Sequence, residues 1–136
     1  MATLTKSDYA IVWAKAKAAG EEAAKKVVPT PMVVMDAHLN GSPVAGGKTY
    51  HVPTGVCGFG LIRIKPAVGG FAKWLKDEGA AHKDSYYGGI VSHAHPAFTR
   101  NSPACQSMEI NGAYASAVAA YLKKYGIPAF SEARMD

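Results

Sequence analysis

The stretch SMEINGAYASAVAAYLKKYG, residues 107–126, decides the fold, because it predicts one long amphipathic helix with both of its ends marked. Ser107 is a typical N-cap residue, and Gly126 is a typical stop. Lys123 and Lys124 fall in the last turn, where cations complement the helix dipole. Apolar residues recur at helical spacing along 107–125. They are Ile110, Ala113, Tyr114, Ala117, Val118, Tyr121 and Leu122.

A second amphipathic helix is predicted over residues 5–28. Thr5 followed by Asp8 resembles a capping box in which Asp replaces the usual Glu, and two prolines follow the helix. One face carries Tyr9, Val12, Trp13, Ala16, Ala23 and Val27. The opposite face is rich in Lys, with Glu four residues before two of them, which indicates a solvated surface rather than a polyanion-binding one.

Three segments between residues 32 and 65 carry strand patterns. MVVMDA, 32–37, is short and apolar and predicts a buried strand. Residues 38–49 are rich in Gly, Pro, Asn and Ser, which is typical of a loop. TYHV, 49–52, and VCGFGLIRIK, 56–65, are expected to pair as a hairpin around PTG.

Two glycines interrupt the strand at 56–65. Gly58 and Gly60 leave part of one strand face without side chains, which predicts a bulge or the close approach of another backbone. Alternation divides the larger side chains between two faces. Val56, Ile62 and Ile64 share one face, and the other carries Cys57, Phe59, Leu61, Arg63 and Lys65.

The remaining elements complete an α+β pattern. Residues 71–79 predict a short helix that ends at Gly79 and buries Phe71, Trp74 and Leu75. Residues 85–95 are expected to be extended. Residues 127–135 predict a final strand, which Pro128 places at a sheet edge or at a strand start. We therefore expect one α+β domain over 1–136, with a small mixed sheet packed by an N-terminal helix, a short middle helix and a long C-terminal helix.

Composition narrows the function classes. The chain has 136 residues, of which 49% are hydrophobic and 18% charged, so it is expected to be ordered. It lacks an apolar run of about 20 residues, and its N-terminal stretch lacks the apolar core of a signal peptide, which favours an unsecreted protein without a membrane span. The net charge is +5, and 12 of the 15 basic residues are Lys. Lysine-dominated charge predicts weak, sequence-indifferent attraction to polyanions, lost near physiological salt.

A metal site is one interpretation of His93 and His95. On a strand both imidazoles would face the same side, about 7 Å apart, and Cys57, Cys105, His51 or His82 would have to complete a zinc site. No second paired motif accompanies them. We therefore expect neither metal nor cofactor, and no nucleotide-binding glycine motif or nucleophile elbow is present either.

The two cysteines differ in their surroundings. Cys57 has apolar strand neighbours, which predict a small buried side chain. Cys105 precedes a helix start, a position that can stabilise a thiolate, so it is the better candidate nucleophile. Two cysteines do not form a disulfide framework in a protein of this kind.

A binding surface is the interpretation that we favour for HKDSYYGG and RNSPACQSME. These segments combine hydrogen-bond donors, aromatic planes and a helix start. The candidate residues are Lys83, Tyr86, Tyr87, Arg100, Gln106 and Ser107. Successive strand tyrosines would point to opposite faces, so one can lie in the core while the other faces out. The segment from His93 to Ala104 is expected to be an exposed loop that tolerates deletion of residues 96–102.

Several short motifs resemble those of small uncharacterised proteins of tailed bacteriophages. They are PTPMVV, GVCGF, FAKWLKDEG, HKDSYYGG, QSME and the C-terminal ARMD. The resemblance implies a phage-encoded protein without an assigned reaction and supplies no catalytic residues. The segment IVSHAHPAFTRNSPAC departs from the family pattern, which is shorter there and does not support a shared active site at His93, His95 and Cys105.

The leading hypothesis is a small phage accessory protein that acts by binding and without catalysis, in the host cytoplasm or in the virion. Its partner would be a host or phage protein or a small anionic ligand, and it could form a homo-oligomer. The alternative is a small hydrolase or transferase that uses a Cys/His or metal site around residues 93–105. A third hypothesis is weak, non-specific binding of nucleic acid.

Overall fold

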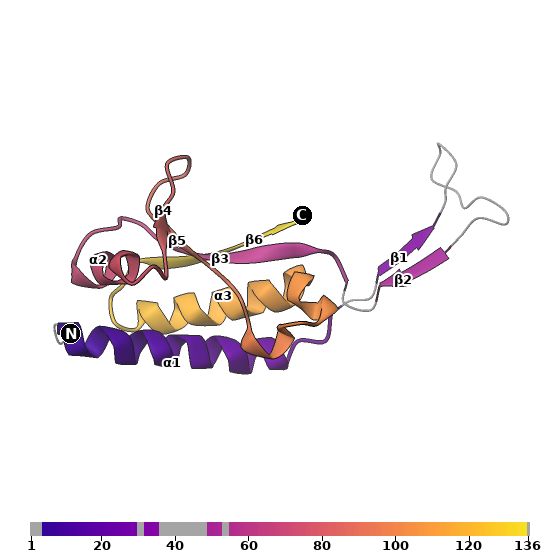
Figure 1. Ribbon diagram of the computed structural model, residues 1–136, viewed down its shortest axis with the longest axis horizontal. Helices are drawn as coiled ribbons and strands as arrows, with labels where there is room; N and C mark the ends of the chain where they lie inside the picture. Colours follow the sequence, from indigo (N-terminus) through magenta and orange to yellow (C-terminus); the bar gives the residue numbers. More distant parts are fainter. Residues whose placement is uncertain (1–3, 30–31, 36–48, 53–54, 136) are drawn as a thin grey trace.

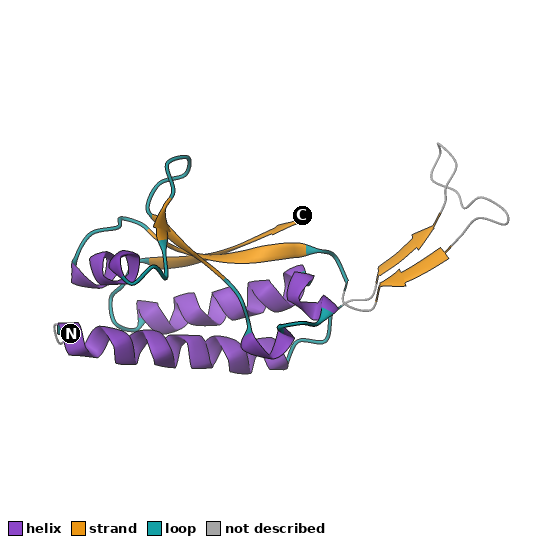
Figure 2. Cartoon of the chain, in the orientation of Figure 1, coloured by secondary structure: helices purple, strands orange, loops and turns teal. Residues whose placement is uncertain are grey.

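The computed structural model describes residues 4–29, 32–35, 49–52 and 55–135. Figures 1 and 2 show long helices beneath a twisted sheet. The elements in chain order are α1 (Lys6–Lys25), β1 (Met32–Met35), β2 (Thr49–Val52), β3 (Gly58–Ile64), α2 (Gly70–Asp77), β4 (His82–Lys83), β5 (Ile90–His93), the 3₁₀ turns η1 (Ala97–Thr99) and η2 (Pro103–Gln106), α3 (Met108–Lys123) and β6 (Ala129–Met135).

The α+β class is confirmed, but strand pairing differs from the prediction. Four strands form a sheet in the order β4-β5-β3-β6, and every pairing in it is antiparallel, so the expected mixed sheet is wrong. The expected β2–β3 hairpin is also wrong, because β2 pairs with β1 in a separate two-stranded sheet. β3 lies between β5 and β6, and six of its seven residues are buried, the exception being Phe59.

The last strand has the place that its sequence predicts. β6 begins at Ala129, directly after Pro128, and it forms one edge of the four-stranded sheet. The loop expected at residues 38–49 falls almost wholly outside the described residues, as does the predicted burial of the side chains of 32–37.

The helix α3 packs on α1 along one side and on the sheet along another (Figure 1). Ser107 is its N-cap, with Oγ accepting a hydrogen bond from the Ile110 N–H at 3.4 Å. Because α3 contacts two layers, its buried residues form a wider band than predicted and include Ala115 and Ala119, whereas Ala113 and Ala117 are only partly buried. Gly20 allows α1 to approach α3 closely, since a β-carbon there would meet Tyr114 and Val118.

The start of α1 follows its sequence prediction. The N–H of Thr5 donates to Asp8 Oδ2 at 2.8 Å, and the Thr5 hydroxyl donates to the same oxygen at 2.8 Å. Trp13 is buried, at 8% exposure, and its ring centroid lies 6.5 Å from that of Phe71 on α2. Trp74 packs against the core and is partly buried, so it is less completely enclosed than Trp13.

The glycines of β3 let two backbones meet. A β-carbon on Gly60 would collide with the Asn111 carbonyl of α3, and one on Gly58 would collide with the Arg134 carbonyl and with Met108. The predicted close approach of another backbone is therefore confirmed. It draws the N-terminal half of α3 down onto the sheet.

The strand register defines a second sheet face, opposite α1 and α3, that we call the open face. Phe59, Leu61 and Arg63 of β3 alternate with the helix-facing Gly58, Gly60, Ile62 and Ile64. The residues that share the open face with them on the other strands are Arg134, Glu132 and Phe130 on β6, Val91 and His93 on β5, and His82 on β4.

Candidate binding site on the open face of the sheet

The two candidate tyrosines lie in a turn between β4 and β5. Asp84 builds this turn: its Oδ1 accepts hydrogen bonds from the N–H groups of Tyr86, at 2.9 Å, and Tyr87, at 3.3 Å. Gly88 and Gly89 then adopt positive φ angles of 88° and 71°, which suit glycine. The predicted extended segment 85–95 is therefore a turn up to Gly89, and the strand runs only from Ile90 to His93.

Both tyrosine rings are exposed, so neither of them lies in the core. Tyr86 is 83% exposed and Tyr87 is 50% exposed. Their centroids lie 4.6 Å apart with the ring planes at 77°, an edge-to-face arrangement. The turn geometry explains this, because alternation between faces applies only to extended residues.

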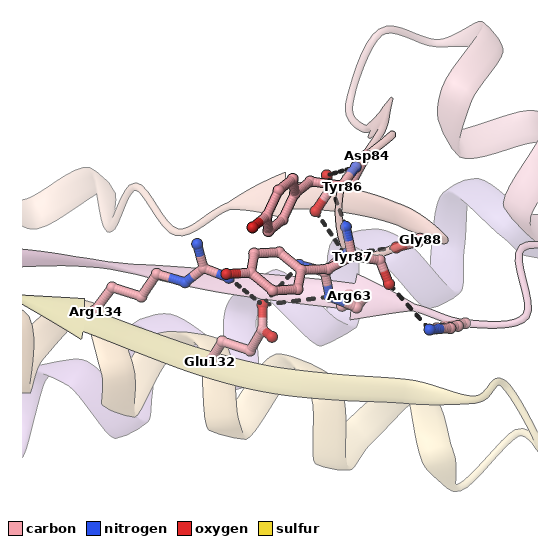
Figure 3. Close-up of polar contacts among 8 residues, drawn as sticks. Arg63, Asp84, Tyr86, Tyr87, Gly88, Glu132 and Arg134 are labelled. Atoms are coloured by element: carbon pink, nitrogen blue, oxygen red, sulfur yellow. Dashed lines mark hydrogen bonds and ion pairs between the residues drawn. The ribbon is translucent and has the colours of Figure 1, made fainter.

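Arg63 anchors this turn to the sheet (Figure 3). Its side chain is only 6% exposed, yet it holds two carboxylates: Nη1 lies 2.8 Å from Asp84 Oδ2, and Nη2 lies 2.9 Å from Glu132 Oε2. Nη1 also donates to the Gly88 carbonyl. The N–H of Tyr86, and after it the Arg63 guanidinium, hold the pKa of Asp84 below its usual value. The buried cation is thus fully engaged inside the protein.

The Tyr87 ring lies within reach of two guanidinium groups. Arg63 Cζ is 5.6 Å from the ring centroid and Arg134 Cζ is 4.7 Å from it, both within cation–π range. Arg134 extends over the ring from the neighbouring strand β6, and its side chain stays 38% exposed (Figure 3). We call Tyr86, Tyr87 and Arg134 the tyrosine–arginine surface.

Sequence reasoning missed both arginines as members of this site. The signal for Arg63 was present, because a charged residue between Ile62 and Ile64 must find partners when the strand is buried. Arg134 gave no comparable signal. Its place beside Tyr87 depends on the pairing of β6 with β3, which brings Arg134 opposite Phe59.

The six predicted binding residues do not form one site. Tyr86 and Tyr87 lie together, and Lys83 is nearby on β4 but pairs with Ile90, on the sheet face toward the helices. Arg100 and Gln106 are exposed and lie beyond the other end of β5. Ser107 is 1% exposed, and its hydroxyl caps α3, so it is not available to a ligand.

Three histidines form a row on and beside the open face. The ring centroids of His82 and His93 lie 5.5 Å apart with nearly parallel planes, and those of His93 and His95 lie 6.1 Å apart. Burial first, and then repulsion from His82 and His95, lower the pKa of His93 from its usual 6.5. No group of three His, Cys, Asp or Glu side chains placed to hold a metal occurs in the described part of the chain.

The cysteines lie apart from the tyrosines. Cys57 is half-buried rather than fully buried, and its Sγ lies 3.9 Å from Gln106 Oε1. Cys105 is exposed and lines a surface pocket of about 410 Å³ together with His95 and Arg100. Cys105 and His95 therefore lie beside one pocket, and the alternative of Cys/His chemistry around residues 93–105 stays a prediction.

The segment 93–104 is more organised than predicted. It contains η1 and the start of η2, and three of its residues, Ala94, Pro96 and Thr99, are buried. The Thr99 hydroxyl donates to the Pro96 carbonyl at 2.8 Å, and the Ala97 N–H donates to Glu21 on α1. An entirely exposed loop is therefore the wrong description, because Ala94 and Thr99 pack inward while their neighbours face water.

Asn111 is a buried polar residue that the sequence did not single out. Its Nδ2 donates to the Gly58 carbonyl at 3.1 Å and to the Cys105 carbonyl at 3.0 Å, so it ties the start of α3 to β3 and η2. These contacts give it a structural role, because both acceptors are backbone carbonyl groups of neighbouring segments.

None of the described helices is long and apolar enough to cross a membrane. Comparisons of the chain with protein-family models, with curated proteins and with solved structures found no match.

Proposed function

We propose that this chain acts by binding rather than by catalysis, and that the tyrosine–arginine surface is where its ligand docks. The observation that carries the proposal is the exposure of Tyr86 and Tyr87 beside Arg134. Exposed aromatic planes next to a cation suit a ligand that is both planar and negatively charged. A nucleotide unit, free or within a single strand, has this chemistry.

The aromatic part of the surface is held in place before any ligand arrives. Asp84 fixes the backbone of both tyrosines, and the buried Arg63 fixes Asp84. A base that stacks on Tyr86 would therefore meet a turn that is already ordered. Preorganisation of this kind lowers the entropic cost of binding.

The charge distribution supports weak rather than tight binding of a strand. Arg63 is neutralised by Asp84 and Glu132, and the exposed guanidinium nearest to the tyrosines is that of Arg134, whose Nη2 lies 3.8 Å from Glu132 Oε2. One guanidinium contacts few phosphates, so a single strand would bind with little dependence on sequence and would dissociate as salt rises.

The resemblance to small tailed-phage proteins adds a biological setting to this proposal. The chain would be a phage-encoded accessory protein, acting in the host cell or in the virion. A protein partner at the same surface is the competing outcome, because Tyr and Arg also dominate protein interfaces.

Fluorescence anisotropy with a labelled single-stranded oligothymidylate of about 12 nucleotides tests the proposal, with AMP as competitor. We expect saturable binding at low salt that Tyr86→Ala weakens about five- to tenfold. Displacement by AMP would indicate that a single nucleotide unit suffices. Displacement only by unlabelled strand would indicate that several units are needed.

Two matched controls separate this surface from general effects. Tyr125→Ala, the control for Tyr86→Ala, removes an exposed tyrosine at the end of α3. Arg100→Gln is the control for the site variant Arg134→Gln: it also removes one positive charge, but at a position beyond the far end of β5. We expect both controls to bind nearly as the wild type does. Equal losses in control and site variants, or no saturable binding at low salt, would refute the proposal.

A further inference from the structure

A second candidate site lies on the other side of the β4–β5 hairpin. A surface pocket of about 310 Å³ opens between α2 and this hairpin, close to the smallest volumes typical of small-molecule sites. Its lining residues are Ala67, Ala72, Lys73, Lys76, Lys83, Gly89 and Ile90. Three lysines and no acidic residue therefore line one opening.

The fold brings these lysines together from two elements. Lys73 and Lys76 are three residues apart on α2, so they lie on one side of that helix. Lys83 pairs with Ile90 across β4 and β5, which directs it to the sheet face toward α2 and away from the tyrosine–arginine surface. The site therefore depends on the tertiary arrangement, and a basic run in the sequence would not reveal it.

Nearby acids do not neutralise the pocket. Asp84, the neighbour of Lys83, is engaged by Arg63. Asp77 pairs with Lys73 at 3.2 Å, but both side chains are more than half exposed, and such pairs contribute little. Among the described residues, Lys76 and Lys83 form no ion pair with a carboxylate. Three cations around one concavity repel one another, and a bound anion relieves that repulsion.

We propose that this pocket binds a phosphate group. Phosphate carries up to two charges and several acceptor oxygens, so it can engage three ammonium groups at once, whereas a carboxylate carries one charge and two oxygens. Ala72 and Ile90 form apolar walls that accommodate the carbon skeleton of a small phosphate ester. The site is separate from the proposed nucleotide surface and does not depend on it.

Calorimetric titration of the full chain with pyrophosphate at low ionic strength, alongside amide chemical-shift mapping, tests this proposal. We expect saturable binding, with the largest shifts at Lys76, Lys83 and Gly89. The Lys76→Gln, Lys83→Gln double variant is expected to weaken binding by about tenfold or more. Acetate and inorganic phosphate serve as further probes, and acetate is expected to bind much more weakly.

The control variant Lys25→Gln, Lys26→Gln makes the same change in net charge at the end of α1, where both side chains are exposed. It should bind pyrophosphate within about twofold of the wild type, because removing distant charges alters only the general attraction. Equal weakening in both double variants, equal binding of acetate, or shifts spread over all surface lysines would overturn the proposal.

AMP distinguishes this site from the nucleotide surface. Tyr86→Ala should leave pyrophosphate binding unchanged, whatever it does to AMP. If pyrophosphate shifts Tyr86 and Arg134 in place of Lys83, the phosphate pocket is refuted and the tyrosine–arginine surface is the anion site. If Tyr86→Ala leaves AMP binding unchanged while the Lys76→Gln, Lys83→Gln variant abolishes AMP binding, the proposal of a nucleotide surface is refuted and the proposal of a phosphate pocket is supported.

Discussion

Arg63 and Glu132 meet across β3 and β6, with guanidinium Nη2 2.9 Å from carboxylate Oε2. They are diagonal neighbours on the open face, since Glu132 stands opposite Leu61 in the register. The same guanidinium reaches Asp84 at the base of the turn. One buried cation thus joins the central strand, an edge strand and the tyrosine turn, so the presentation of the tyrosines is coupled to the stability of the sheet.

Replacing Arg63 should destabilise the protein through the carboxylates that it leaves behind. We expect Arg63→Leu to lower the free energy of unfolding by about 2–3 kcal/mol, less than for a fully buried pair because Asp84 and Glu132 still touch water. Urea denaturation measures the change. Adding Asp84→Asn and Glu132→Gln should recover part of the loss, and a triple variant no more stable than Arg63→Leu would contradict this explanation.

Stability should depend on pH through His93. Its pKa is lowered in the folded state, so the unfolded chain binds more protons just below pH 6.5. Stability is then fully present above 6.5 and falls as the pH drops through the lowered pKa. His93→Gln should flatten this part of the urea-unfolding profile. His82→Gln should raise the pKa of His93 in an NMR titration, because it removes a repelling charge, and an unchanged pKa would exclude that coupling.

The two glycines at the contact between β3 and α3 should respond differently to alanine. Gly60→Ala forces a β-carbon into the Asn111 carbonyl and is expected to cost about 1–3 kcal/mol. Gly112→Ala meets only the Ala133 β-carbon, at 3.3 Å, and gains helix propensity, so its net effect should be small. Thermal unfolding of the Gly60→Ala and Gly112→Ala variants checks this difference. Equal melting temperatures of the two variants would show that β3 and α3 can move apart at little cost.

The two tryptophans should also differ. Trp13→Ala empties a buried position and is expected to cost about 3–5 kcal/mol, whereas Trp74→Ala should cost clearly less because Trp74 is only partly buried. Chemical denaturation of both variants gives the comparison. If Trp74→Ala proved the more damaging change, the packing between α2 and α1 would need a different account.

Deleting residues 96–102 should destabilise the domain, contrary to what the composition of the segment suggests. The deletion removes the buried Thr99 and the hydrogen bond from the Ala97 N–H to Glu21. A Phe98→Ser variant is the matched control, because Phe98 is 42% exposed within the same segment. Retention of the wild-type melting temperature in the deletion variant would restore the description of the segment as a dispensable loop.

Local features of the fold were predictable and long-range ones were not. Both long helices follow from apolar spacing and from caps such as Thr5 and Ser107, which act within a few residues. The partners of β3 could not be read locally, because β5 and β6 are distant in sequence and compete with the nearby β2. The hairpin was expected because β2 and β3 are close in the chain, but β3, with six of its seven residues buried, pairs with β5 and β6 instead.

The candidate site was found in part for the same reason. Aromatic residues beside a Gly-Gly pair directed attention to Tyr86 and Tyr87, and the structure exposes both. Arg134 lies almost fifty residues later and reaches them only through the β3–β6 register. Arg100 and Gln106 were grouped with the tyrosines because they are close in sequence. In space, the strand β5 lies between them and the tyrosines.

The pairing of α1 with α3 has a consequence for how the chain acquires its structure during translation. α1 ends at Lys25, but its main packing partner α3 begins only at Met108, and the central strand β3 pairs with β6, which follows α3 in the chain. A ribosome-bound chain therefore exposes the apolar side of α1 until α3 has been made. Productive folding is delayed until both α3 and β6 have been made, and until then the exposed apolar side of α1 is a site at which the nascent chain can aggregate.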